Sequence, residues 1–161
     1  MACGLALICA LFFSCASQPK VRTFVADDGV QQFFVRPVSV RFASAKVDFD
    51  CLIRTKEGVI IDPVTVNYSV TDKKNELSAA PVLQFNIASG KFPVESRKVI
   101  FTSIENNMTR YSSTVDPASF TDIIHESESL TVTLLEGSQE VGTVSSNEVS
   151  GRFALLKKVI K

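Results

Sequence analysis

Apolar and polar residues alternate with a period of two along several stretches of this chain. Between Val38 and Phe42, for example, the polar residues Ser39 and Arg41 separate the apolar positions. Successive side chains of a β-strand point to opposite faces of the sheet, so this alternation predicts strands with one buried face. The pattern recurs in residues 47–53, 64–70, 83–87 and 130–134. One-sided strands of this kind are typical of antiparallel sheets.

Short polar segments that favour chain reversal separate the predicted strands. They lie at residues 27–29, 56–58, 72–75, 89–91 and 136–138. Many short strands at this spacing predict a mainly β fold, an antiparallel β-sandwich that we expect from about Phe33 to Val144. The residues that should face its core together are Val64, Val66, Tyr68 and Val70.

One segment before residue 130 departs from the two-residue period. Asp116 followed by Pro117 is typical of an N-cap and a first helical position. Phe120, Ile123 and Ile124 then share one face of a helix. The sequence therefore predicts a short helix here.

The last segment, residues 150–161, is compatible with a helix or with a final strand. Phe153, Leu156 and Ile160 would share a helical face, whereas Phe153 and Leu155 alternate as in a strand. The pattern leaves both alternatives open.

The order of features near the end of the chain resembles that of a known group of proteins. A short helix precedes a hairpin at Glu136 and Gly137, and an apolar segment follows Gly151. This order is similar to that of small exported β-sandwich proteins of the invasion-associated locus B type. The resemblance implies a fold and no functional residue.

The N-terminus differs from the rest of the chain. No charged residue lies between Met1 and Cys15, and the run from Leu5 to Phe13 is continuously apolar. About 20 apolar residues are needed to span a bilayer, so the run fits a secretory signal peptide better than a transmembrane helix. Because no Lys or Arg precedes it, either the start lies upstream or the signal is unusual.

The segment Phe12-Phe13-Ser14-Cys15 resembles the lipobox of bacterial lipoproteins. In that family a small residue precedes a Cys that receives a diacylglycerol before cleavage. The resemblance implies a signal peptide over 1–14, a lipidated Cys15 with a linker over 15–20, and one domain over 21–161. The protein would be lipid-anchored at the cell membrane or outer membrane, on the extracytoplasmic side. The alternatives are ordinary signal cleavage near Ala16 or a buried apolar segment.

Composition limits the possible partners and chemistry. With 17 basic and 17 acidic residues the formal net charge is zero, which argues against a nucleic-acid partner. His125 is the sole His of the sequence, and no Gly-x-Ser-x-Gly motif occurs. Cys51 lies on the apolar face of its strand, which predicts a buried thiol. We expect no catalytic residue, no cofactor and no metal.

Two polar clusters remain as candidates for binding. Asp48 and Asp50 share a strand face and could hold calcium or serve in acid–base chemistry. We expect them instead to be solvated or to pair with Lys46 and Arg54. Arg110 and Tyr111 are the candidates for ligand binding, because an Arg beside a Tyr can grip an anion or a sugar. A structural role on an edge strand is the favoured alternative.

These observations favour a non-catalytic, membrane-anchored envelope lipoprotein that serves as an interaction or structural module. Its partners would be the membrane, through N-terminal acyl chains, and another envelope protein. The alternative is a module that binds lipid or another hydrophobic ligand in a cavity between sheets, suggested by the 12 Phe residues. A hydrolase has only generic Ser, Asp and Glu in its favour.

Overall fold

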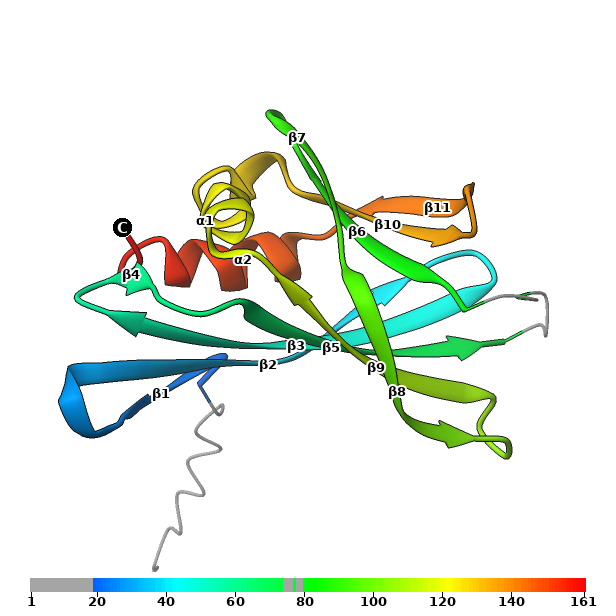
Figure 1. The fold of residues 1–161 in the computed structure, drawn as a ribbon. Helices are drawn as coiled ribbons and strands as arrows, with labels where there is room; N and C mark the ends of the chain where they lie inside the picture. Colours follow the sequence, from blue (N-terminus) through cyan, green and yellow to red (C-terminus); the bar gives the residue numbers. More distant parts are fainter. Residues whose placement is uncertain (1–18, 74–76, 78–79) are drawn as a thin grey trace, which may run out of the picture.

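The computed structural model describes residues 19–73, 77 and 80–161; the predicted signal peptide and Cys15 lie outside the described residues. Strands and two α-helices make up most of the described chain (Figure 1). The strands are β1 (Val21–Val25), β2 (Val30–Arg41), β3 (Ala45–Lys56), β4 (Val59–Ile60), β5 (Val64–Asp72), β6 (Val82–Ile87), β7 (Gly90–Pro93), β8 (Glu95–Ser103), β9 (Met108–Val115), β10 (Thr131–Glu136) and β11 (Gln139–Ser145). The helices are α1 (Pro117–His125) and α2 (Asn147–Leu156).

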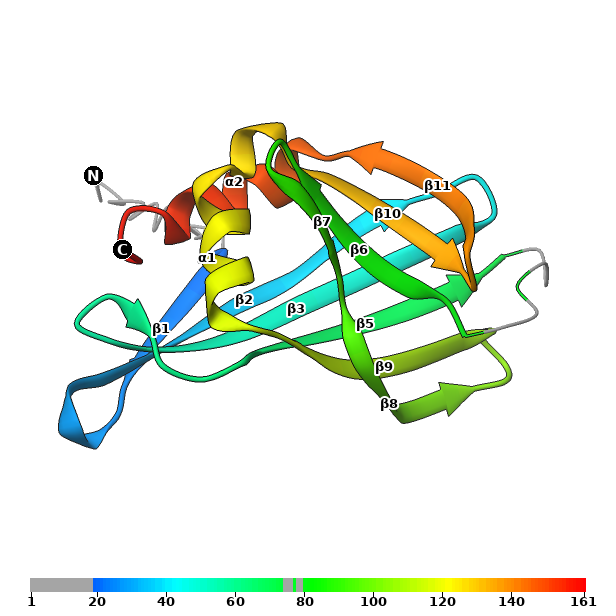
Figure 2. The ribbon, with the colours of Figure 1, turned by 45° about the horizontal axis from the view of Figure 1, so that its top comes forward.

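Two antiparallel sheets form a sandwich, which confirms the predicted fold class. The first sheet has the order β1-β2-β3-β5-β9-β8, with β4 paired to β3, and the second has the order β11-β10-β6-β7. The second sheet covers one half of the inner face of the first sheet, and α1 and α2 cover the other half (Figures 1 and 2). The long strands of the first sheet therefore contact two different layers.

Aromatic rings join these layers in one core. Phe49 of the first sheet contacts Phe85 of the second edge-to-face, with ring centroids 5.6 Å apart. Phe85 in turn contacts Phe153 of α2 at 5.9 Å, and Phe153 contacts Phe120 of α1 at 5.6 Å. The four residues predicted to face inward from β5 are all buried, as expected: Val64, Val66, Tyr68 and Val70.

Both helices begin with a side-chain cap. The backbone N–H of Ser119 donates to Asp116 Oδ1 at 2.9 Å, and hydrogen bonds from Ser119 lower the pKa of Asp116 below its ordinary value. Ser146 caps α2 in the same way through Val149.

The C-terminal segment is helical up to Leu156, so the alternative of a final strand is wrong.

The sandwich begins before the expected start at Phe33 and ends at Ser145, one residue beyond the expected Val144. β1 begins at Val21 and pairs with β2, and β8 and β9 form a hairpin that the alternation did not predict. Most of β1 is exposed, so its sequence shows no buried face. β8 carries two register shifts, which interrupt the period of two.

Candidate functional site

An ion pair between a buried carboxylate and a partly exposed arginine lies at the centre of the outer face of the first sheet. Asp50 on β3 is only 3% exposed. Arg110 Nη2 on β9 donates to Asp50 Oδ2 at 2.5 Å, and Asn67 Nδ2 on β5 donates to Asp50 Oδ1 at 2.9 Å. Arg110 Nη1 also donates to Ser69 Oγ at 3.0 Å. Both carboxylate oxygens of Asp50 thus have partners on neighbouring strands.

This pair corrects the expected partners of the acidic residues. Asp48 pairs with Lys46 at 2.8 Å, as expected. Asp50 is neither solvated nor paired with Lys46 or Arg54, because Arg110 reaches it across β5. Arg54 instead pairs with the exposed Asp62 at 2.6 Å. An acid–base or calcium role for Asp50 would require breaking its bond to Arg110.

Arg110 and Tyr111 lie on opposite faces of β9. Tyr111 points inward and stacks on Tyr68, with ring centroids 5.1 Å apart. β9 is an interior strand between β5 and β8, so the expected edge position is wrong. The two side chains therefore cannot bind one ligand together. Arg110 forms hydrogen bonds with β3 and β5 on the outer face, and Tyr111 packs in the core on the inner face.

The other side chains with possible catalytic or metal-binding roles, Cys51 and His125 among them, do not form a cluster in the described part of the chain. Cys51 is fully buried, as predicted, and burial raises the pKa of its thiol well above the ordinary value, with a further contribution from the charge of Asp50. A thiol that stays protonated is a poor nucleophile. His125 is exposed at the end of α1. No group of three or more metal-ligating side chains occurs within the described ranges.

The edge strand β8 carries a contiguous apolar surface. Val99, Ile100 and Phe101 are each more than half exposed, and Ile104, just beyond the strand, is 91% exposed. We call these four residues the edge-strand patch. The register shift between Val99 and Phe101 breaks the alternation. Three successive apolar side chains therefore remain exposed, and the apolar run itself was the signal that a search for alternation missed.

No family model, curated protein or solved structure matches this chain. In the described part of the chain, neither helix has the length and hydropathy needed to cross a membrane. The geometry of the described side chains is therefore the basis for assigning a function.

Replacing Arg110 should destabilise the fold more than replacing Arg54. Arg110→Met leaves the carboxylate of Asp50 buried without its cationic partner, which should lower the free energy of unfolding by about 1–3 kcal/mol. Arg54→Met removes a pair that is exposed on both sides, and the expected loss is about 0–1 kcal/mol. Urea unfolding of both variants measures the difference. Equal losses would show that the Asp50–Arg110 pair has no special structural role.

Proposed function

We propose that this chain is a non-catalytic envelope lipoprotein, anchored to the cell membrane or outer membrane through acyl chains on Cys15, and that its domain is an interaction module. The lipobox-like segment supports the anchor. A short linker from Cys15 leads directly to β1, which brings the domain close to the membrane. Several buried acyl chains, at about 0.8 kcal/mol per CH₂, hold a soluble domain firmly on a bilayer.

The edge-strand patch is the observation that carries the interaction role. An edge strand presents unpaired backbone N–H and C=O groups, and soluble proteins usually protect such edges with charged side chains. β8 exposes Val99, Ile100 and Phe101 in succession, directly after the exposed Lys98. An extended segment of another envelope protein could pair with this edge and bury these side chains. A catalytic role has no comparable support among the described residues.

The alternative of a hydrophobic ligand between the sheets has less support. The Phe residues that suggested it pack against one another across the sandwich: Phe49, Phe85, Phe120 and Phe153. All four are fully buried. These rings fill the space that such a ligand would need.

Cys15→Ala should abolish lipid attachment in a bacterial host that processes lipoproteins. The thiol of Cys15 is the nucleophile that would receive the diacylglycerol, so radiolabelled fatty acid should no longer be incorporated. Cys51→Ala is the matched control, since the buried Cys51 should have no part in acylation and labelling should be unchanged. If Cys15→Ala still incorporates the label, Cys15 is not the anchor.

Charges placed in the edge-strand patch should block the protein partner. A photocrosslinking residue at Ile104 should give one defined protein adduct in native membranes. Ile100→Lys with Phe101→Lys should remove this adduct, because charge on an edge strand opposes pairing. Val25→Lys with Val59→Lys is the control, since both valines are exposed outside the patch. An adduct that survives the substitutions on β8 contradicts this interface.

A further inference from the structure

Two adjoining hollows lie where β1 meets α2, at the point where the chain enters the domain. Figure 2 shows the start of β1 beside α2. The first is an apolar groove of about 370 Å³, lined chiefly by Val21, Phe33, Leu155, Leu156 and Val159. The second, of about 250 Å³, is lined by Lys20, Arg36, Pro37 and Arg152. Lys20 lines both hollows.

The C-terminal part of the chain contributes to both hollows. Arg152 lines the basic hollow, and Leu155, Leu156 and Val159 line the apolar groove. Arg152 and Leu155 are three residues apart and Leu156 follows, which places them on one side of the helix. Leu155 is 40% exposed and Val159 is 45% exposed, so part of the apolar groove remains open to solvent. An elongated ligand could therefore contact a basic hollow at one end and apolar side chains along its length.

Arg152 is held rigidly in the basic hollow. It is only 8% exposed, and its Nη1 donates to the carbonyl oxygens of Arg36 at 2.9 Å and Lys20 at 3.3 Å. Its Nη2 donates to Glu148 at 2.6 Å. Its Nε is buried and has no hydrogen-bond partner among the described residues. The guanidinium of Arg152 thus contributes positive charge to the wall of this hollow, while its Nε lies below the surface.

The charges around this hollow favour an anion. Within the described ranges, no acidic group forms an ion pair with the side chains of Lys20 or Arg36. Glu148 is the acidic side chain bonded there, and its partner is Arg152. Among the described residues, the positive charges of Lys20 and Arg36 therefore have no ion-paired carboxylate. Guanidinium and ammonium groups together are the usual ligands of phosphate in proteins.

We propose that the two hollows form a binding site for an anionic phospholipid. An acyl chain lies in the groove against Leu155 and Val159, and the phosphate contacts the side chains of Lys20 and Arg36 where they line the basic hollow. The proposed anchor supplies the lipid, and only this supply rests on the proposed function. Cys15 precedes Pro19 by four residues, so an extended linker places the site within about 14 Å of the anchored residue.

Vesicle binding tests the basic part of the site. The full chain with Cys15→Ala, which carries no acyl group, should bind vesicles of phosphatidylglycerol and phosphatidylcholine in preference to vesicles of phosphatidylcholine alone. Adding Lys20→Gln and Arg36→Gln should weaken binding about 25-fold, since each basic side chain at an anionic surface contributes about fivefold. Adding Lys91→Gln and Lys98→Gln instead removes the same charge from β7 and β8 and should leave binding unchanged. If the two pairs of substitutions weaken vesicle binding equally, the proposed site is wrong.

A photoactivatable lipid tests the groove. Phosphatidylglycerol with a diazirine in its acyl chain should label the segment around Leu155 and Val159 in the Cys15→Ala protein. Leu155→Gln with Val159→Gln should remove that label, and Val99→Gln with Ile104→Gln should not. Labelling confined to the apolar N-terminal segment would overturn the proposal.

A soluble lipid separates a headgroup from a free phosphate. Dihexanoyl phosphatidylglycerol should bind the Cys15→Ala protein at least tenfold more tightly than inorganic phosphate, because its chains reach the groove. Equal affinity would mean that the hollow takes an anion and no lipid, which overturns the proposal. All of these measurements use a protein that cannot be acylated at Cys15. A failure here is therefore distinct from a failure of the proposed anchor.

Discussion

The hydrogen bonds of Arg152 to the carbonyl oxygens of Lys20 and Arg36 join the two ends of the described chain. Burying a guanidinium without acceptors is costly, so α2 packs where these two carbonyl oxygens lie within reach of Arg152. Arg36 lies in the irregular part of β2, where the register with β3 shifts between Val35 and Val38, next to Pro37. The C-terminal helix is thus bonded to the irregular part of β2 and to the residue before β1.

This placement of α2 has consequences on both sides of the helix. On the inner side it brings Phe153 against Phe85 and Phe120, which connects the second sheet to α1. On the side next to β1 it leaves Leu155 and Val159 beside the first residues of the domain. The core and the proposed lipid site therefore depend on the same contact, although they lie on different faces of the helix.

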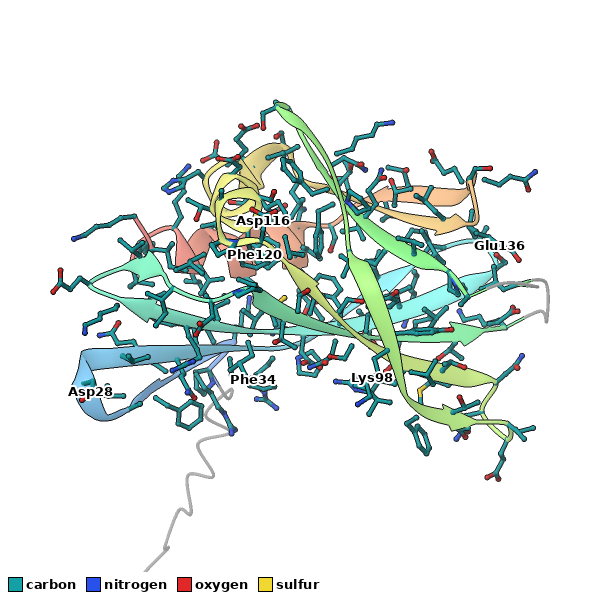
Figure 3. All side chains as sticks on the ribbon, viewed as in Figure 1. Asp28, Phe34, Lys98, Asp116, Phe120 and Glu136 are labelled. Carbon is teal, nitrogen blue, oxygen red and sulfur yellow. The ribbon has the colours of Figure 1, made fainter. Side chains whose placement is uncertain are left out.

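The outer face of the first sheet is organised by polar contacts. Figure 3 shows Phe34 and Lys98 on this face, turned away from the helices. Asp50 and Arg110 join three strands there, and no layer of the described chain covers them. The proposed membrane end at β1 and the edge-strand patch at β8 lie on opposite edges of the same sheet. An anchored domain could therefore contact the bilayer with one edge and a protein partner with the other.

Local sequence patterns predicted the elements whose cause is local. The period of two located β3 and β5, and Asp116 with Pro117 located α1, because facing and capping depend on near neighbours. Contacts between distant residues gave no such signal. Asp50 and Arg110 are 60 residues apart, and Arg152 lies 132 residues from Lys20. β1 and β8 were missed because neither shows one fully buried face among its described side chains, and a buried face is the property that alternation reports.

The orientation of the domain on a membrane tests this account most directly. Acylated protein can be placed in nanodiscs that contain a gadolinium-chelating lipid, and the broadening of backbone amide signals then reports distance from the lipid headgroups. The account predicts strong broadening for Val21, Thr23 and Leu155 and little for the hairpin of β8 and β9. Strong broadening of the hairpin, or equal broadening throughout, would contradict the proposed membrane face.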